Sequence, residues 1–455
     1  MLIELAVSNY RSIRDEQRLS LVAGREKIHR DANTFEPAQP KGRKRLCLLR
    51  SVALYGPNAS GKTNLVRALA TMRRVVLESQ QRMGSLPMEY FLFDHSKPYF
   101  QQPTLLEVII MVEGVRYQYG FSATAERIHD EWLFAFPKGR EQRWFEREFF
   151  PIDARDEFTF GNNLAGDKEV WRRATRPDAL FLSTAVQLNS QQLLPLFNWF
   201  KDTLCVVGIG GLPPYHSLEW CRNDGERKQR ILKFLRVADF NINDVVVEGT
   251  PIDPELSLND LPISIRPIVL DRISKARKED YTVYFMRRIT PEPQLKPNIE
   301  IDRERQPRPY ATLSYTAYAR LDIKQESDGT QKMFNLAAPW LDALDQGRVL
   351  VVDELHDNLH PLLVQFLVRL FHSPDTNPKG AQLLFTTHET SILSDEYLRR
   401  DQIWFFERDK EQASRLYPLT NFKPPKGIAN LEQDYLVGGY GAVPFLRNPS
   451  RIFED

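Results

Sequence analysis

The sequence predicts an α/β fold with a mixed sheet, an N-terminal antiparallel β lobe and a mainly helical insertion. Three observations support this prediction. A buried strand runs through a glycine-rich turn into a helix near residue 60, apolar runs flank the tight-turn dipeptide Glu113-Gly114, and buried strands alternate with helices again after residue 330. The length of 455 residues suits one large α/β domain with an insertion or subdomain.

Strands dominate the first part of the chain. Apolar runs predict strands at 2–7, 17–23, 46–55, 106–112, 115–121, 132–134 and 180–184. The run at 46–55 shows little alternation, which is typical of a strand buried on both faces. Apolar residues at helical spacing predict a helix over 64–77, whereas residues 137–179 are charged and irregular.

The rest of the chain mixes both kinds of element. Helices are predicted at 191–200, 226–237, 333–344 and 362–371, and strands at 245–248, 281–287, 349–353, 382–386 and 403–407. Prolines and charges fill 250–310 without a heptad pattern, so no coiled coil is expected there. We therefore expect a core made of residues 1–184, which include the β lobe, and 311–455, with the insertion at 185–310.

Composition narrows the class of protein. Lys and Arg total 61 against 60 for Asp and Glu, so the net charge of +1 gives no global signal for nucleic-acid binding. Three scattered cysteines suit a reducing cytoplasm rather than a disulfide framework. The N-terminal run is interrupted by Glu4, and no apolar stretch approaches about eighteen residues. We expect a cytoplasmic protein without a signal peptide, membrane span or channel.

Residues 56–63 carry the strongest motif. Their sequence, GPNASGKT, matches G-x-x-x-x-G-K-[ST], with a buried strand before it and a helix after it. The glycines let the backbone wrap tightly, so that N–H groups point at phosphate oxygens, and the helix adds its positive N-terminal end. Lys62 is expected to reach the β- and γ-phosphates, and Thr63 to ligate Mg²⁺. The expected nucleotide contacts are Gly56, Asn58, Ser60, Gly61, Lys62 and Thr63.

A second motif lies near residue 350. Residues 349–352 form an apolar strand that runs into Asp353 and Glu354. A strand delivers its last side chains to the carboxyl edge of the sheet, where the glycine-rich loop also lies. Asp353 is then expected to hold Mg²⁺ through water, and Glu354 to polarise the attacking water. The alternative is a strand that merely ends in solvated acids, which the presence of the phosphate motif disfavours.

Two further segments complete the pattern. The apolar run 382–386 leads to His388, which could be structural or could sense a γ-phosphate; its position after the second motif favours sensing. Residues 326–332, ESDGTQK, precede a helix and offer Ser and Gly backbone donors at its start, which is another phosphate-binding design. The alternative for this segment is an ordinary N-cap. The candidate contacts are Ser327, Gly329 and Gln331.

The order of these motifs resembles that of the ABC ATPases. Residues 326–332 look like a variant of the signature of that superfamily, which usually reads L-S-G-G-Q. Glu326 replaces the leucine, Asp328 replaces the first glycine, and Gln331 comes one place late. The resemblance implies an ABC-type P-loop NTPase that hydrolyses ATP to ADP and phosphate. The residues that it places in catalytic roles are Lys62, Glu354 and His388.

Two closer resemblances lie within that superfamily. The opening Asn9-Tyr10-Arg11-Ser12-Ile13 resembles the start of the RecF, SMC and OLD group, in which the basic residue can contact phosphate. This suggests Arg11 as an ATP contact. The chain more closely resembles stand-alone bacterial AAA/ABC-like ATPases found beside effector genes in antiviral defence loci. The segments that carry this second resemblance are YQYGF at 117–121, EWL at 131–133 and GYGAVP at 439–444.

The resemblance also implies an assembly. In ABC ATPases, the P-loop of one subunit and the signature of another enclose the same ATP. A homodimer or higher homo-oligomer is therefore implied, in which Ser327 and Gly329 act across an interface. ATP binding would close the pair, and hydrolysis by Glu354 would release it.

Two functions remain open at this point. The first is a sensor or regulator of an antiphage defence complex that controls a separately encoded, nuclease-like effector; residues 389–455 are too few for the Toprim nuclease of OLD proteins. The alternative is a RecF- or SMC-like DNA-repair ATPase that binds DNA directly. Basic residues of the insertion, among them Arg222, Arg227, Arg272 and Arg287, could serve a partner or nucleic acid, or could be a solvated surface.

Overall fold

The computed structural model describes most of the chain. The described residues are 1–38, 46–82, 84–94, 98–207, 215–251, 279–289, 317–423, 430–445 and 448–449. The chain divides into a first compact unit, Met1–Leu212 with Trp340–Asp455, and a second, Pro213–Pro339. Arg272 and most of the stretch 250–310, for which no coiled coil is predicted, lie outside the described residues.

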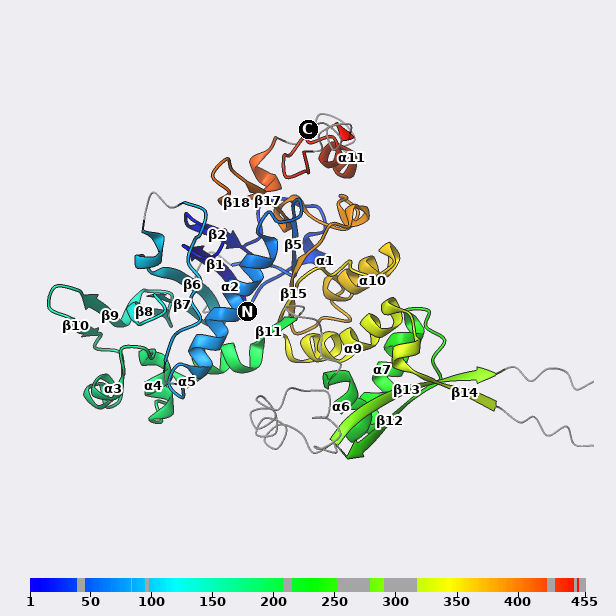
Figure 1. The fold of residues 1–455 in the computed structure, drawn as a ribbon, viewed down its shortest axis with the longest axis horizontal. Helices are drawn as coiled ribbons and strands as arrows, with labels where there is room; N and C mark the ends of the chain where they lie inside the picture. Colours follow the sequence, from blue (N-terminus) through cyan, green and yellow to red (C-terminus); the bar gives the residue numbers. More distant parts are fainter. Residues whose placement is uncertain are drawn as a thin grey trace, which may run out of the picture. The chain divides into compact units, whose positions relative to one another are not determined.

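A six-stranded sheet in the first unit carries the strands of both predicted phosphate motifs (Figure 1). Its order is β11 (Leu204–Val207), β15 (Val349–Val352), β16 (Gln382–Thr386), β5 (Ser51–Tyr55), β17 (Ile403–Arg408) and β18 (Ser414–Pro418). The first five strands run parallel and β18 is antiparallel, so the sheet is mixed as predicted. β5, β15 and β16 are buried at every position, which explains their continuous apolar runs. Parallel pairing brings their carboxyl ends to one edge.

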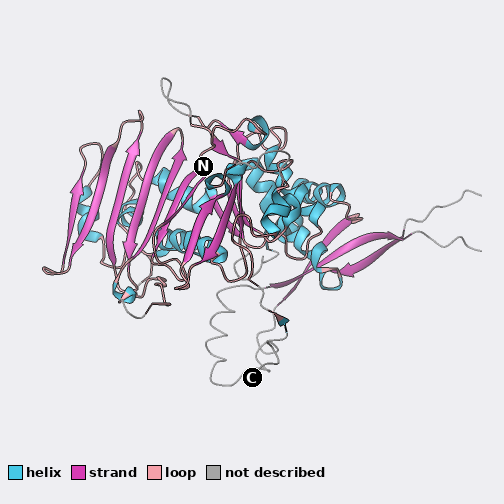
Figure 2. Cartoon of the chain, turned by 90° about the horizontal axis from the view of Figure 1, so that it is seen from above, coloured by secondary structure: helices cyan, strands magenta, loops and turns pink. Residues whose placement is uncertain are grey.

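The predicted N-terminal lobe is a seven-stranded antiparallel sheet (Figure 2). Its order is β10 (Arg155–Phe160), β9 (Gln142–Phe150), β8 (Ile128–Phe136), β7 (Val115–Ala123), β6 (Thr104–Val112), β1 (Leu2–Ser8) and β2 (Gln17–Ser20). Glu113 and Gly114 form the expected tight turn between β6 and β7, with φ angles of 49° and 78°. The alternating residues Leu106, Val108 and Ile110 are buried, so one face of the lobe joins the hydrophobic core of the unit.

Helix α2 (Lys62–Glu78) follows the glycine-rich loop and confirms the helix predicted there. Its buried residues Leu65, Leu69, Met72 and Val76 recur at three- and four-residue spacing and share the core with the lobe. Further helices of this unit are α1 (Arg30–Asn33), α3 (Lys168–Ala174), α4 (Phe181–Gln187), α5 (Leu194–Asn198), the π-helix η2 (Trp199–Thr203), α10 (Pro361–His372) and α11 (Leu431–Leu436). Among the described residues, no helix combines the length and the apolar character that crossing a membrane requires.

The strand predicted at 180–184 is wrong, because these residues lead into and form helix α4. The first five residues of α4 are all buried, so the run shows no helical periodicity. The buried carboxylate of Glu131 accepts hydrogen bonds from the N–H groups of Phe181 and Leu182, at 2.6 and 3.0 Å, and so satisfies the start of the helix. The stretch 137–179 is not irregular throughout either, since it holds β9, β10 and α3.

The second unit combines helices with a three-stranded antiparallel sheet. The sheet order is β12 (Asp244–Pro251), β13 (Glu279–Ile289) and β14 (Ala317–Asp322). The helices are α6 (Tyr215–Asn223), α7 (Gly225–Val237), the short η4 (Ile323–Gln325) and the first part of α9 (Asp328–Gln346). The helix predicted at 226–237 and the strands predicted at 245–248 and 281–287 are therefore confirmed.

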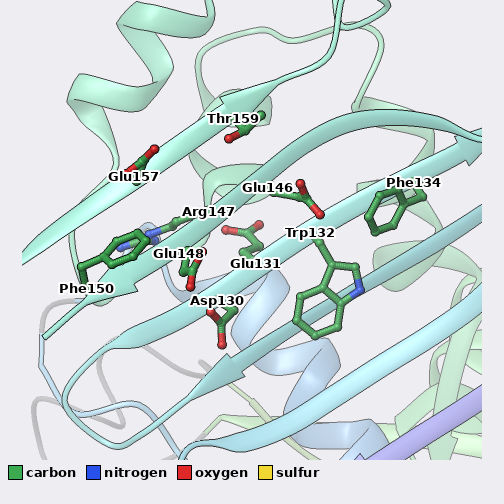
Figure 3. Close-up of a pocket in the computed structure, with 10 residues that line it drawn as sticks. All are labelled: Asp130, Glu131, Trp132, Phe134, Glu146, Arg147, Glu148, Phe150, Glu157 and Thr159. Atoms are coloured by element: carbon green, nitrogen blue, oxygen red, sulfur yellow. The ribbon is translucent and has the colours of Figure 1, made fainter.

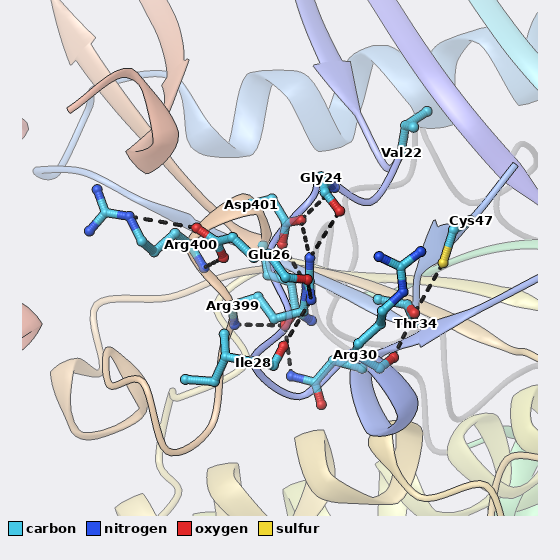
Figure 4. A network of polar contacts seen from close by, with 12 residues as sticks. Val22, Gly24, Glu26, Ile28, Arg30, Thr34, Cys47, Arg399, Arg400 and Asp401 are labelled. Atoms are coloured by element: carbon cyan, nitrogen blue, oxygen red, sulfur yellow. Dashed lines mark hydrogen bonds and ion pairs between the residues drawn. The ribbon is translucent and has the colours of Figure 1, made fainter. Parts of the chain in front are cut away.

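A buried ion pair anchors the segment that follows β2 (Figure 4). Arg399 and Asp401 pair at 2.7 Å, and the Arg399 side chain is fully buried. Arg399 donates to the carbonyl oxygens of Glu26 and Ile28, at 2.9 and 2.8 Å, and Asp401 accepts the N–H of Gly24 at 2.7 Å. This pair therefore fastens three positions of the segment to the loop that precedes β17.

Candidate nucleotide-binding site

The glycine-rich loop joins β5 to α2, as the sequence predicts. Gly56 and Gly61 have φ angles of 147° and 112°, a region that residues with side chains rarely adopt. A Cβ at Gly56 would lie 2.9 Å from Ser60 Oγ, and one at Gly61 would lie 2.9 Å from Ser12 Oγ. The tight course of the loop therefore requires glycine at both positions.

Ser414 holds the loop backbone, and Ser12, from a distant part of the sequence, contacts Ser414. The hydroxyl of Ser414, in β18, donates to the carbonyl oxygen of Ser60 at 2.7 Å. The hydroxyls of Ser12 and Ser414 lie 2.7 Å apart, and Asn64 of α2 donates to Ser12 Oγ at 2.7 Å. Motif reasoning missed both serines. Ser12 lies in the opening segment 9–13, which could have indicated it, whereas no local pattern marks Ser414.

Lys62 is buried at the start of α2, with 6% of its surface exposed. Its Nζ donates to the carbonyl oxygens of Gly56 and Pro57, at 2.7 and 3.1 Å, and lies 3.1 Å from Nε2 of His388. Burial lowers the pKa of Lys62 to about 8, although the two acids that follow β15 act in the opposite direction. The lysine thus folds back on its own loop, where a polyanion would be a stronger partner for its charge.

The two predicted magnesium ligands lie side by side. Thr63 Oγ1 donates to Asp353 Oδ1 at 3.2 Å, and Thr386 Oγ1 donates to the same oxygen at 2.7 Å. Thr386 Oγ1 also accepts the backbone N–H of Glu354 at 2.7 Å. Glu354 itself has a φ of 51°, a left-handed conformation that is rare outside glycine. The end of β16 therefore positions both acids. Thr386 was not predicted, although its place at the end of that strand could have indicated it.

The residues present fit a phosphate chain and a Mg²⁺ ion. The Ser60 hydroxyl is buried and has no hydrogen-bond partner among the described residues, so it can donate to a ligand oxygen. The hydroxyl of Thr63 and the carboxylate of Asp353 supply the oxygen ligands that Mg²⁺ takes in phosphate sites.

His388 lies just after β16, at the same edge of the sheet. Its backbone N–H donates to Nδ1 of His356 at 3.4 Å, and the two rings meet edge to face at 5.4 Å. Burial, together with the charge of Lys62 and the ring of His356, lowers the pKa of His388 to about 4. At neutral pH the imidazole is therefore uncharged, with one nitrogen that donates and one that accepts.

An open cavity of about 470 Å³ lies beside the glycine-rich loop, Glu354 and His388. Its volume falls in the range of roughly 300–1,000 Å³ that is usual for ligand sites. The residues that line it are Gly56, Pro57, Asn58, Glu354, His356, Asp357, His388, Tyr435 and Pro444. The cavity therefore joins the loop, the acid after β15 and the histidine after β16, as the motifs predict. His356, Tyr435 and Pro444 are additions that sequence reasoning did not identify as site residues.

A second cavity, of about 380 Å³, lies on strands β8, β9 and β10 of the lobe (Figure 3). It is lined by carboxylates from all three strands, next to aromatic side chains; the acids are Asp130, Glu131, Glu146, Glu148 and Glu157. Arg147 also lines it, but this side chain is fully buried and paired with Asp156 at 3.2 Å. The negative charge of these carboxylates disfavours the binding of a polyphosphate, which is also negatively charged. The cavity at the glycine-rich loop is therefore the candidate nucleotide site.

Arg11 contacts Glu89 through both its side chain and its backbone. Its guanidinium forms an ion pair with Glu89 at 2.6 Å, and its backbone N–H donates to the Glu89 carbonyl oxygen at 2.8 Å. Arg11 is not one of the residues that line the cavity. Its contact with ATP stays a prediction.

The three signature-like residues belong to the second unit. Ser327 Oγ accepts the N–H of Thr330 at 3.3 Å, which is the geometry of an N-cap for α9. Gln331 donates its side-chain amide to the carbonyl oxygen of Glu326 at 2.9 Å, and Glu326 pairs with Arg287 at 2.9 Å. The N-cap alternative thus describes the local structure, while the role of Ser327, Gly329 and Gln331 toward a nucleotide stays a prediction.

The fold and the site define the class of protein, an ABC-like P-loop protein of the α/β type. The particular family follows from its sequence. Residues 51–184 and 222–394, more than half of the chain, match the family described as "AAA domain, putative AbiEii toxin, Type IV TA system". The chain belongs to this family. No curated protein matches it.

Some solved structures show a distant likeness. The SMC head domain from Thermotoga maritima is 11% identical, with a TM-score of 0.37 and coverage of 92% of this chain and 98% of that chain. The SMC head bound to the C-winged helix domain of ScpA is 10% identical, with a TM-score of 0.37 and coverage of 92% and 97%. The recombination mediator RecF with ATP is 13% identical, with a TM-score of 0.30 and coverage of 85% and 93%.

Proposed function

We propose that this protein binds ATP together with Mg²⁺ and hydrolyses it to ADP and phosphate. One observation carries the proposal: Lys62, Thr63, Asp353 and Glu354 meet at the carboxyl edge of the parallel strands. They lie next to a loop whose Ser60 hydroxyl has no hydrogen-bond partner within the part of the chain that the structure describes. Membership of a family described as an AAA domain supports it.

Each side chain has a task that follows from its position. The loop N–H groups and the start of α2 bind phosphate oxygens, and Lys62 turns from its loop carbonyls toward the β- and γ-phosphates. Thr63 and Asp353 would hold Mg²⁺, which neutralises phosphate charge when bound. Glu354 orients the attacking water and accepts its proton. His388 donates a hydrogen bond to the terminal phosphate.

Assembly driven by ATP is the second part of the proposal. Ser327, Gly329 and Gln331 of one subunit complete the ATP site of another, so that ATP closes a homodimer or higher homo-oligomer and hydrolysis opens it. This assembly controls a separately encoded, nuclease-like effector in antiphage defence. The description of the family as a putative toxin of a Type IV TA system supports a place in a system of several components.

Two substitutions test this function. Lys62→Ala removes the phosphate-binding charge, so we expect ATP binding to be lost. Glu354→Gln keeps binding but is expected to slow hydrolysis by about 10²–10⁴-fold, and so to hold the ATP-bound assembly, which light scattering measures as a larger mass. Asp375→Asn, an exposed acid outside the cavity, is the control. Unchanged hydrolysis in Glu354→Gln would contradict the site. Phage protection that survives both substitutions would contradict the regulatory role.

A DNA-binding ATPase of the RecF or SMC kind is the second candidate. Helix α7 favours it, because Arg227, Arg230, Lys233 and Arg236 are all exposed on this one helix. Arg227 is partly neutralised by Asp224 at 3.3 Å, so the exposed charge is smaller than the count of basic residues indicates. Salt-dependent DNA binding that requires ATP would support this candidate, and no binding at low salt would exclude it.

A further inference from the structure

Thr386, the last residue of β16, contacts both acids that follow β15. Its hydroxyl donates to Asp353 Oδ1 at 2.7 Å and accepts the backbone N–H of Glu354 at 2.7 Å. A threonine hydroxyl has one proton to donate and lone pairs with which to accept, so this group uses both capacities at once. Thr386 is fully buried, so solvent does not compete for these hydrogen bonds.

The strand order places Thr386 between the two motifs of the site. In the six-stranded sheet, β16 lies between β15, which leads to the acids, and β5, which leads to the glycine-rich loop. Val352, the last residue of β15, pairs with Phe385, and the next residue of β16, Thr386, pairs with Leu54 of β5. Because paired parallel strands advance in step, Asp353 and Thr386 come level at the carboxyl edge of the sheet.

Thr386 also holds the backbone turn that carries Glu354. Glu354 has a φ of 51°, in the left-handed region that is strained for a residue other than glycine. The N–H groups of Glu354 and Leu355 donate to the hydroxyl and to the carbonyl oxygen of Thr386, at 2.7 and 3.0 Å. Two consecutive N–H groups of the turn therefore bind one residue, which holds the conformation in which Glu354 lines the nucleotide cavity.

The two hydroxyls that donate to Asp353 differ in their other tasks. Thr63 Oγ1 donates to Asp353 Oδ1 at 3.2 Å, but Thr63 follows Lys62 in the glycine-rich motif and is itself a proposed Mg²⁺ ligand. Thr386 is fully buried and is not one of the residues that line the cavity, so it can keep both hydrogen bonds when a nucleotide binds. A residue that orients a metal-binding carboxylate in this way typically affects metal affinity or activity by about 10–100-fold.

We propose that Thr386 is a positioning residue of the nucleotide site, whose single hydroxyl orients Asp353 toward Mg²⁺ and fixes the turn that directs Glu354 to the attacking water. This inference rests on the proposed ATP hydrolysis. The N–H of Glu354, the hydroxyl of Thr386 and the carboxylate of Asp353 form a chain of hydrogen bonds, and each bond in such a chain strengthens the next. Removal of the hydroxyl therefore affects both acids.

The substitution Thr386→Val tests this role, because it keeps the β-branched shape and removes the hydroxyl. We expect the turnover at saturating ATP and Mg²⁺ to fall about 10–100-fold. The gain in affinity for a non-hydrolysable ATP analogue on addition of Mg²⁺ is expected to fall about five- to tenfold, which corresponds to the loss of one hydrogen bond. The affinity without Mg²⁺ is expected to change less than about twofold, because the glycine-rich loop keeps its contacts. Isothermal titration of the full chain measures these affinities.

Two further variants separate positioning from packing. Thr386→Ser returns the hydroxyl and is expected to restore most of the turnover and most of the Mg²⁺-dependent gain. Thr184→Val is the matched control, because Thr184 is also fully buried and its hydroxyl donates to the carbonyl oxygen of Leu180, in helix α4, at 2.9 Å. We expect Thr184→Val to leave both values unchanged. Thermal unfolding checks the fold of each variant, and Thr386→Ala, with the same expected losses, replaces a valine variant that does not fold.

Each outcome decides the proposal. A turnover in Thr386→Val that equals wild type once Mg²⁺ is saturating would overturn the role toward Glu354, and an unchanged Mg²⁺-dependent gain would overturn the role toward Asp353. Equal losses in Thr184→Val, or no recovery in Thr386→Ser, would show that packing rather than the hydroxyl is responsible. A wild-type chain that does not hydrolyse ATP would instead overturn the proposed function itself.

Discussion

Lys62 is a buried cation whose protonation connects stability to pH. Its pKa in the folded protein is about 8, below the ordinary 10.5, because burial disfavours the charge. Between these two values the unfolded chain binds a proton that the folded chain does not, so the free energy of unfolding rises as pH rises through this window. Below pH 8 both states are protonated, and the cost of burying the charge is fully present.

Lys62→Met removes this titration and keeps a side chain of similar length. Without nucleotide, we expect the stability of the variant relative to wild type to be highest at pH 7 and to fall by on the order of 1–3 kcal/mol toward pH 10. Thermal unfolding of both proteins between pH 7 and 10 measures this difference. A difference that does not vary with pH would show that Lys62 is not desolvated in the folded protein.

At the scale of elements, the loop depends on its contact with β18. Ser414 is almost fully buried, and its hydroxyl is the donor to the Ser60 carbonyl oxygen. Ser414→Ala is expected to lower the free energy of unfolding by about 1–3 kcal/mol, because a buried acceptor loses its partner, and also to weaken ATP binding because the loop loses its anchor. Denaturant unfolding and nucleotide titration measure the two effects.

Ser183→Ala is the matched control for this prediction. Ser183 is also buried, and its hydroxyl donates to the carbonyl oxygen of Val76 at 2.6 Å, near the end of α2 that lies away from the loop. We expect a similar loss of stability with unchanged nucleotide affinity. If both variants weaken ATP binding equally, the contact between β18 and the loop has no specific role in the site.

The elements that the sequence predicts well are those whose signal is local. The glycine-rich loop, the acids at 353 and 354 and the strand at 382–386 each show a complete pattern within about ten residues. Ser414 shows none, because it reaches the loop only through the order of strands β5, β17 and β18. The sequence predicts a strand instead of a helix at 180–184, because burial on all sides removes the periodicity that distinguishes a helix from a strand.

At the scale of the whole molecule, the two halves of the proposed ATP site belong to different compact units of the chain. The loop and both acids lie in the first unit, and Ser327 lies in the second. Thr63 and Asp353 are in direct contact, so the loop and the acids act within one subunit. The proposed contribution of Ser327 comes from another subunit. A subunit with a defective loop and a subunit with a defective Ser327 are therefore expected to restore ATPase activity when they are mixed. A subunit with a defective loop and a subunit with a defective acid are not expected to do so.

Mixing two inactive variants tests this arrangement. Lys62→Ala has an intact Ser327, and Ser327→Arg has an intact loop, so half of the dimers in an equal mixture contain one complete composite site. We expect the mixture to recover about a quarter of wild-type ATPase activity, although each variant alone is inactive. A mixture of Lys62→Ala with Glu354→Gln is the control and is expected to stay inactive, because every site in it carries a defective loop or a defective acid. Recovery in neither mixture would mean that Ser327 does not complete a neighbour's site, and equal recovery in both would mean that the acids do not act with the loop of their own subunit.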